Sequence, residues 1–249
     1  MIEENISFDR PIVVDIIVCY NNNDLYSDMQ RSIQERGGSG VKWNIIGIDN
    51  TENSFKSAAE AYNYALKKSN GDCVVFCHQD ILFLEGSLAT IAQKCLSFPK
   101  TLWGAAGVKK AGEIISNMYC VREERKYGTL QEGNDAPVQT LDECLIAGHR
   151  SLFEKFPFDE ETCYAWHLYA VDLSIQCILS KYEVKVFDAN IIHLSGGNMD
   201  YTFWESEKRL AKKYQGKINK INTTCCWTYT HPFLFMLLRF YRRIRHKIY

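Results

Sequence analysis

Polar side chains stand directly after three apolar runs in the first 80 residues, where they could bind a ligand. If the runs are parallel strands, their carboxyl ends meet at one edge of a sheet, which is where ligands gather in open α/β sheets. Polar loops also begin at strand ends without any function. The residues concerned are Tyr20, Asn21, Asp49, Asn50, His78, Gln79 and Asp80.

Asp80 and His193 are the candidate ligands for a cation. Asp80 precedes the apolar stretch ILFL, which is a poor helix start, so its carboxylate needs a partner other than a helix N-terminus. His193 closes a later apolar run just before Ser195 and could be a metal ligand, a phosphate contact or a structural histidine. We interpret His78 as a hydrogen-bonded residue at the rim of the site.

Asp172 is the candidate general base. It lies within an apolar helical face that includes Leu168, Val171 and Ile175. A carboxylate on a packed face is costly unless it is paired, bonded or open to a cleft. Burial would raise its pKa, which suits a group that takes a proton from a hydroxyl. A bond to nearby backbone or to a lysine is the alternative.

Other site chemistries find little support in the sequence. Neither GxGxxG nor GxxxxGK[ST] occurs, and the glycines at 37–40 fall in a turn between a helix and the next strand. The ten cysteines are scattered, so we interpret them as reduced core residues. Cys73 and Cys77 lie along a strand, where four residues span about 13 Å, too far for one zinc ion.

Short apolar runs alternate with helical patterns, which predicts an α/β fold with a parallel sheet. One long helix is expected over residues 164–181, and Asn53 or Ser54 is expected to cap the helix that carries Phe55 and Tyr62. The predicted strands are 12–19, 43–48, 73–77, 102–108, 114–121, 184–187 and 190–194.

Charge is distributed unevenly along the 249 residues, whose formal sum is only -1. Residues 1–207 carry -12, and the rest carry +11 because no acidic residue follows Glu207. The average charge gives no reason to expect nucleic acid as a partner, whereas a basic tail on an acidic body favours contact with an anionic surface. The first ten residues lack the pattern of a secretory signal, so we expect a cytoplasmic protein.

The last residues, 231–249, predict an amphipathic helix. Its longest apolar run has six residues, too few for the about 20 that cross a bilayer. Leu237, Phe240 and Ile244 fall on one face, and Arg239 and Arg243 on another. Such a helix can lie on an anionic membrane surface. Docking on the domain or on a second copy is the alternative.

The order and spacing of several blocks resemble a known family. DIIVCYNN, IIGIDNT, an alanine-rich helix with Asn63, GDCVVFCHQDI and the later stretch WHLYAVDLSIQ to HLSGG occur in order between about residues 11 and 215. Together they resemble a family 2 glycosyltransferase of the GT-A fold, in the bacterial branch with HQD in place of DxD.

The resemblance implies a Rossmann-like α/β fold with a mixed, mostly parallel sheet flanked by helices. We therefore expect one glycosyltransferase domain at residues 1–215, followed by the basic amphipathic helical tail at 216–249 that the charge and apolar pattern predict without the resemblance. It also implies inverting transfer of a sugar from a nucleotide-diphospho-sugar, with a UDP-sugar favoured, to a saccharide or lipid-linked saccharide. We expect this activity in bacterial surface polysaccharide synthesis, at the inner face of the cell membrane.

Site residues follow from the resemblance by position. Tyr20, Asn21, Asp49, Asn50 and Asn63 would bind the nucleotide. Asp80, with His193 as a further ligand, would hold a divalent cation, Mn2+ or Mg2+, whose charge offsets that of the departing diphosphate.

The chain departs from the family at Ala170, where the base is common. Asp172 or His167 could take that role, and we choose Asp172. A catalytically silent sugar-nucleotide or partner-binding protein and a metal-dependent hydrolase that uses Asp80 and His193 remain the rival hypotheses.

Overall fold

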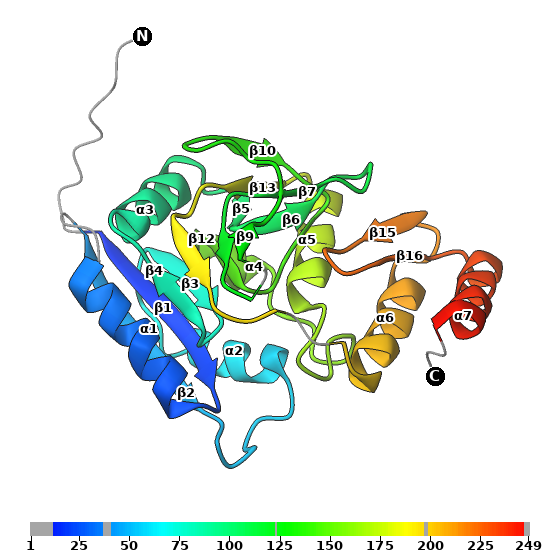
Figure 1. Cartoon of the computed structure of the whole chain (residues 1–249), viewed down its shortest axis with the longest axis horizontal. Coiled ribbons are helices and arrows are strands. Elements are labelled where there is room, and N and C mark those ends of the chain that lie inside the picture. The colour runs from blue at the N-terminus through cyan, green and yellow to red at the C-terminus, as the bar shows by residue number, and fades with distance from the viewer. Residues whose placement is uncertain (1–11, 37–40, 123, 197–198, 247–249) are drawn as a thin grey trace, which may run out of the picture.

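The computed structural model has one central sheet with helices on both faces (Figure 1). It describes residues 12–36, 41–122, 124–196 and 199–246. The predicted turn at 37–40 and the last three residues of the tail lie outside the described residues.

Seven strands form the central sheet. β1 pairs in parallel with β2 and β3, and β13 pairs in parallel with β5. β12 runs antiparallel to β3 and β5, and β10 runs antiparallel to β13. Five strands therefore point the same way, and the expected mixed, mostly parallel sheet is confirmed. In sheet order the strands are β10 (Asp135–Pro137), β13 (Glu183–Phe187), β5 (Thr101–Gly104), β12 (Leu145–His149), β3 (Cys73–Cys77), β1 (Val13–Tyr20) and β2 (Lys42–Asp49).

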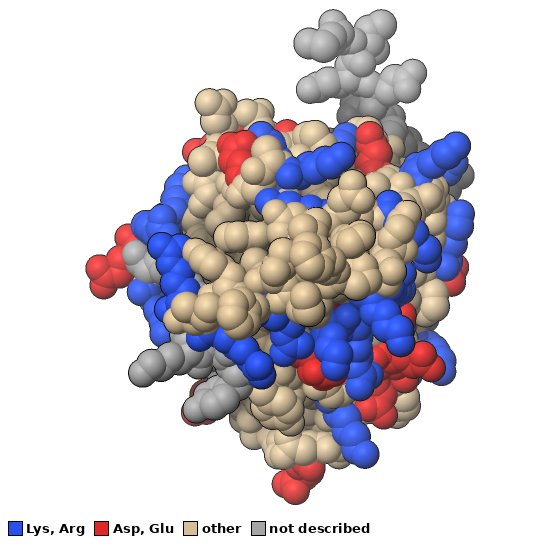
Figure 2. Space-filling view, turned by 90° about the vertical axis from the view of Figure 1, so that its right-hand side faces the viewer, with Lys and Arg blue, Asp and Glu red and all other residues tan. Residues whose placement is uncertain are grey.

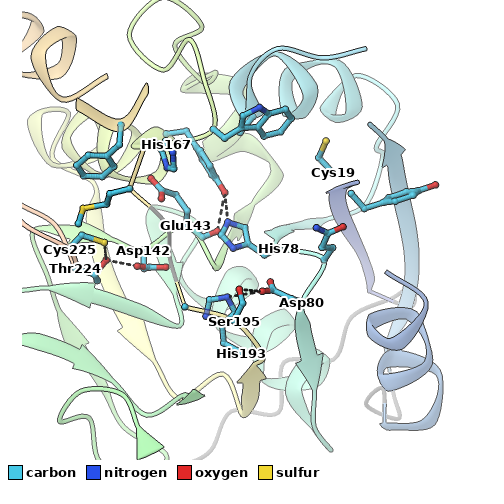
Figure 3. Close-up of a pocket in the computed structure, with 18 of the residues that line it drawn as sticks. Cys19, His78, Asp80, Asp142, Glu143, His167, His193, Ser195, Thr224 and Cys225 are labelled. Carbon is cyan, nitrogen blue, oxygen red and sulfur yellow. Dashed lines mark hydrogen bonds and ion pairs between the residues drawn. The ribbon is translucent and has the colours of Figure 1, made fainter. Parts of the chain in front are cut away.

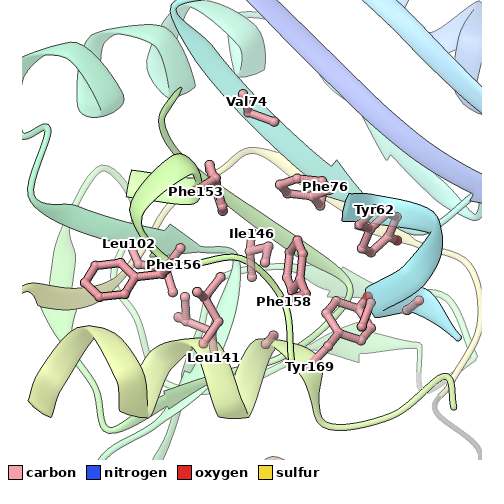
Figure 4. Close-up of a cluster of buried hydrophobic side chains, with 14 of the residues drawn as sticks. Tyr62, Val74, Phe76, Leu102, Leu141, Ile146, Phe153, Phe156, Phe158 and Tyr169 are labelled. Carbon is pink, nitrogen blue, oxygen red and sulfur yellow. The ribbon is translucent and has the colours of Figure 1, made fainter. Parts of the chain in front are cut away.

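Both faces of the central strands are buried, which explains the nearly continuous apolar run of β1 and the continuous run of β3. Ile17 and Phe76 pack into one core (Figure 4), and Ile16 and Val75 pack into the other. The first core lies against α2 (Ala58–Leu66), α4 (Arg150–Lys155) and α5 (Tyr169–Leu179), and the second against α1 (Asn23–Arg36) and α3 (Ser87–Ser97).

Smaller sheets extend the edge where the parallel strands end. In one of them His193 stands opposite Ile81, so the residue next to Asp80 pairs with the strand that carries His193. This pairing joins two segments that are more than a hundred residues apart in the sequence. The sheets are β4 (Ile81–Phe83), β14 (Ile191–His193), β8 (Tyr119–Cys120) and β9 (Arg125–Lys126), and then β11 (Thr140–Leu141), β6 (Ala106–Val108) and β7 (Ile114–Ser116).

Four predicted segments differ from the structure. The run 102–108 divides at Ala105 between two sheets, and the run 114–121 divides into β7 and β8, which lie in different sheets. Helix α5 begins at Tyr169, not 164, because Leu168 has a left-handed backbone with φ of 67°. Ser57 caps α2 by accepting a hydrogen bond from the Glu60 N–H, so neither Asn53 nor Ser54 is the cap.

The chain after residue 215 is joined to the body more closely than a tail would be. Gln139 donates to the Lys220 carbonyl, and Thr140 donates to that of Asn222. These bonds connect the hairpin of β15 and β16, which lies within the predicted tail, to the rest of the protein. No helix among the described residues is long and apolar enough to span a bilayer. The elements are α6 (Tyr201–Lys213), β15 (Lys220–Asn222), β16 (Trp227–Tyr229) and α7 (Pro232–His246).

Candidate functional site

A cavity of about 460 Å³ opens at the carboxyl ends of β1 and β3 (Figure 3). Its lining comes from both halves of the chain, including Tyr20 after β1, His78 after β3 and Tyr169 at the start of α5. In Figure 3, Cys19 lies on one side of His78 and Asp80, and Glu143 lies on the other. We call the part of the lining beside β1, with Tyr20, the first end of the cavity, and the part with Asp142 and Glu143 the second end.

His78, Asp80 and His193 form a cluster at the middle of the cavity. One ligand atom from each lies within 4.8 Å of the other two. Nε2 of His193 is 3.4 Å from Oδ2 of Asp80 and, within the described part of the chain, this buried nitrogen has no hydrogen-bond partner. Two imidazoles and a carboxylate, with one nitrogen left without a partner, fit a divalent cation.

The surrounding structure holds these three side chains in place. Ser195 donates a hydrogen bond to Asp80, and the Leu194 N–H donates to the Asp80 carbonyl. The Tyr169 hydroxyl lies 3.3 Å from Nε2 of His78 and donates to the Glu143 carbonyl. Our interpretation of His78 as only a rim residue was therefore incomplete, because it also belongs to the cluster.

Burial and mutual charge set the ionisation of the cluster. Burial opposes ionisation of Asp80, yet the adjacent His193 and the bond from Ser195 hold its pKa well below the usual range. Burial would lower the pKa of His193, but the Asp80 carboxylate raises it. Burial lowers the pKa of His78. An anionic Asp80 between two imidazoles is the form that a cation requires.

Tyr20, Asn21 and Asn50, which we predicted as nucleotide ligands, line the end of the cavity beside β1. Gln79 fixes this end because its side chain accepts from the Asn21 N–H and donates to the Asn21 amide oxygen. Asn50 holds the next loop by exchanging two hydrogen bonds with the backbone of Phe55. Tyr20 stacks on another ring, so its own ring is held in a fixed plane.

Asp49 and Asn63 are not part of the cavity lining. Asp49 is exposed beside it, and its carboxylate accepts from the N–H and the hydroxyl of Thr51. Asn63 exchanges hydrogen bonds with the backbone of Phe158 and donates to Glu160. Asp49 thus lies beside the end of the cavity that Tyr20 lines, and Asn63 fixes a loop.

Asp172 does not reach the cavity. It is 1% exposed, in the contact between α5 and α6. Lys213 donates to both of its oxygens at 2.7 and 2.8 Å, and Tyr214 and Gln176 each donate at 2.7 Å. Burial raises its pKa as expected. The Asp172 carboxylate is thus bonded to a lysine, which is the alternative to a general base that the sequence left open.

The second end of the cavity contains residues that the sequence did not single out. Asp142 and Glu143 lie between β11 and β12, and Thr224 and Cys225 come from the hairpin that we had assigned to the tail. Thr224 donates to Asp142 at 2.5 Å, which joins the hairpin to the cavity wall. The sequence signal that could have identified Asp142 and Glu143 is the position of two adjacent acids before the apolar run LIAG.

Solved structures share this fold. A crystal structure of GalNAc-T7 with UDP, GalNAc and Mn2+ matches 82% of this chain with a TM-score of 0.62 and 9% identity. S. aureus TarS matches 83% with a TM-score of 0.57 and 14% identity. The chain spans 49% of the GalNAc-T7 chain and 40% of the TarS chain. These neighbours confirm the GT-A fold.

Comparisons of the sequence itself identify a relative and a family. A protein of Fuscovulum blasticum described as "ATP synthase subunits region ORF 6" is 22% identical over 199 residues, which cover 76% of this chain and 78% of that protein. The sequence pattern of the glycosyltransferase-like family matches residues 15–217, which include the cavity residues from β1 to α6. The chain therefore belongs to the glycosyltransferase-like family.

Proposed function

We propose that this protein transfers a sugar from a nucleotide-diphospho-sugar to a hydroxyl acceptor with the help of a divalent cation. The observation that carries the proposal is the cluster of His78, Asp80 and His193 at the middle of a cavity that has a polar end beside β1. A cation there would face a diphosphate bound between the two ends of the cavity and offset its charge.

Tyr20, Asn21 and Asn50 form the nucleotide end in this proposal. The ring of Tyr20 can stack on a base, and the asparagine amides can bond to a base edge or a ribose. Asp49 lies beside this end and can accept from ribose hydroxyls. Two structural neighbours favour a UDP-sugar, since GalNAc-T7 was crystallised with UDP and the TarS fragment 1-349 with UDP-GlcNAc.

Mn2+ suits the cluster better than Mg2+. Imidazole nitrogen is a ligand for the softer divalent ions, whereas Mg2+ prefers oxygen in a strict octahedron. His78 and His193 supply nitrogen, and Asp80 supplies the anionic oxygen. When bound, the cation stabilises the negative charge that develops on the leaving diphosphate.

A thermal-shift assay tests the donor and cation assignments together. We expect UDP-GlcNAc or UDP-GalNAc to raise the melting temperature in the presence of Mn2+ and to have little effect after chelation. Asp80→Asn should abolish the Mn2+-dependent shift, and Glu161→Gln, which changes an exposed acid outside the cavity, should retain it. An unchanged shift in Asp80→Asn would refute the cation site.

The remaining parts of the proposal concern the product. We propose inversion at the anomeric carbon, with a saccharide or lipid-linked saccharide as acceptor and surface polysaccharide as the end product. NMR of the anomeric proton distinguishes inversion from retention. Donor binding without turnover would favour a silent binding protein, and hydrolysis of esters without sugar nucleotide would favour a metal-dependent hydrolase.

Helix α7 favours a position at the inner face of the cell membrane. It docks through Leu238 and through Arg242, which donates to Glu207 at 2.7 Å. Figure 2 views the molecule from the side on which α7 lies and shows an uncharged patch at the centre, bordered by Lys and Arg. The helix exposes Phe233, Leu234, Met236, Leu237, Phe240, Tyr241 and Ile244.

An anionic bilayer suits this patch because each bordering basic residue adds about 1 kcal/mol of attraction near the surface. The described cysteines are all free thiols, as in a reducing compartment. We expect cosedimentation with vesicles that contain phosphatidylglycerol, and its loss in the double variant Phe240→Ser with Ile244→Ser. If light scattering instead showed a dimer that this variant disrupts, a second copy would be the partner.

A further inference from the structure

We infer that Glu143 is the general base of the transfer reaction, in place of the carboxylate that Ala170 lacks. The inference rests on the proposed transferase function and adds a catalytic residue to it. Glu143 lines the cavity, on the side of the His78 and Asp80 pair opposite to Cys19 (Figure 3). This is the end left for an acceptor once a nucleotide occupies the end beside β1.

The backbone fixes the position of Glu143. Its carbonyl accepts a hydrogen bond of 3.0 Å from the Tyr169 hydroxyl, which also contacts His78. Tyr169 thus links the segment that carries Glu143 to His78 of the proposed cation site. The residue sits in the short connection between β11 and β12, two strands of separate sheets, so this segment has little freedom to move.

The carboxylate of Glu143 has an unused acceptor. Oε1 is buried and has no hydrogen-bond partner among the described residues. A buried polar atom without a partner is rare and costs free energy, unless a ligand supplies the missing donor. A hydroxyl is such a donor, and an acceptor sugar or water would provide one at this end of the cavity.

The other acids near the cavity are already engaged. Asp142 accepts from Thr224 and from the Cys144 N–H, one bond on each oxygen. Asp80 belongs to the cation cluster. Asp172 is outside the lining and bonded to Lys213. His167 lines the cavity but lies 3.5 Å from the Asp200 carboxylate. Among the acids of the described cavity lining, Glu143 is therefore the one with an oxygen that has no hydrogen-bond partner, and His167 is the rival base that the test below must exclude.

The reaction step balances with this single base. The acceptor hydroxyl attacks the anomeric carbon, so a new C–O bond forms. The bond between that carbon and the diphosphate oxygen breaks, and the nucleoside diphosphate leaves with the electron pair. The hydroxyl proton moves to Oε1 of Glu143. Trp166, Met199 and Phe203 also line the cavity and offer apolar surface for a sugar ring.

Ionisation of Glu143 sets the expected pH dependence. Burial, followed by the charge of Asp142, raises its pKa to about 8, while the Leu168 N–H acts in the opposite direction. A base must be ionised, so turnover should rise with pH up to about pH 8. The titratable groups that surround it are Tyr62, His78, Asp142, Cys163, His167, Tyr169 and Cys225.

The test measures donor binding and donor consumption in the same variants. Glu143→Gln keeps the shape of the side chain, so it should bind UDP-GlcNAc or UDP-GalNAc with Mn2+ as the unaltered chain does. Release of UDP should fall by about 10²–10⁴-fold, the usual contribution of a general base, and the rise towards pH 8 should disappear. Glu161→Gln serves as the matched control.

Azide separates a base from a merely structural residue. Azide attacks carbon without losing a proton, so it should restore donor consumption in Glu143→Ala but not in Asp80→Ala. Turnover of Glu143→Gln within about twofold of the unaltered chain, well below the usual general-base effect, would overturn the inference. The inference would also be overturned if turnover fell to a comparable extent only in His167→Gln, and if azide restored donor consumption only in that variant.

The same experiment separates the two proposals. If the unaltered chain bound no sugar nucleotide, the proposed function would fail, and the base assignment with it. If the chain bound donor but never consumed it, the transferase activity and the base would both be overturned. Binding and turnover that survive in Glu143→Gln would overturn the base alone.

Discussion

Glu143 and Asp172 are two buried carboxylates with opposite surroundings. Asp172 receives hydrogen bonds from Lys213, Tyr214 and Gln176, whereas Oε1 of Glu143 has no partner in the described structure. Burial raises the pKa of both side chains. A raised pKa therefore does not distinguish a structural acid from one available for chemistry; the presence or absence of partners does.

The two carboxylates also differ in what their packing accomplishes. Asp172 joins α5 to α6, where Tyr214, Leu210 and Phe203 form a small core with the outer face of α5. Glu143 lines the cavity instead, and its Oε1 is buried without a hydrogen-bond partner among the described residues. The comparison predicts that changes at Asp172 affect folding and that changes at Glu143 affect the reaction.

The largest expected effect on stability is that of Asp172→Ala. Removing the carboxylate leaves the half-buried Lys213 with Asp159 as its remaining acidic partner. Loss of one member of a buried ion pair costs about 3–5 kcal/mol of unfolding free energy. Urea denaturation at pH 7 measures this change.

Two variants control the Asp172→Ala result. Lys213→Met combined with Asp172→Leu should cost less than the two single changes together, because neither member of the Asp172–Lys213 pair is then left without the other. Asp28→Ala removes an exposed pair and should change stability by less than about 0.5 kcal/mol. A loss below about 1 kcal/mol in Asp172→Ala would contradict the structural role.

Glu143→Gln should change the pH dependence of stability. The pKa of Glu143 is about 8 in the folded chain, against an ordinary value of 4.5. Between these values the unfolded chain has lost the proton that the folded chain retains, so stability falls as pH rises. Ionisation of one group changes the unfolding free energy by at most about 1.4 kcal/mol per pH unit in this window.

The measurement compares urea unfolding of the unaltered chain and Glu143→Gln from pH 5 to pH 9. The variant lacks the titrating group, so it should gain stability relative to the unaltered chain up to about pH 8 and then run parallel to it. Glu161→Gln should follow the unaltered chain throughout. Parallel curves for all three proteins would show that Glu143 is ionised normally.

The sequence predicted the central fold because local patterns and global burial agree there. The nearly continuous apolar run of β1 and the continuous run of β3 reflect burial on both faces, and polar residues at their ends meet at one edge. The division at Ala105 and the left-handed backbone of Leu168 depend on contacts made by distant strands and helices. No local pattern contains that information.

The site could be predicted only in part. Asp80 and His193 were identified, but their proximity comes from the pairing of β4 with β14. The face of α5 on which Asp172 lies is buried by α6 rather than open to the cavity, and helical periodicity does not separate these cases. Thr224 and Cys225 were missed because nothing in the sequence indicates that the hairpin reaches the cavity.

Asn50 and Asn63 repeat the same contrast at a smaller scale. Each side chain exchanges two hydrogen bonds with the backbone of a loop, but only Asn50 lines the cavity. Replacing either by alanine should cost about 1–2 kcal/mol of unfolding free energy, because backbone groups lose their partners. Calorimetric titration with UDP should then show weaker binding for Asn50→Ala and unchanged binding for Asn63→Ala. Equal loss of UDP affinity in both variants would mean that the loop held by Asn63 also contributes to the nucleotide end.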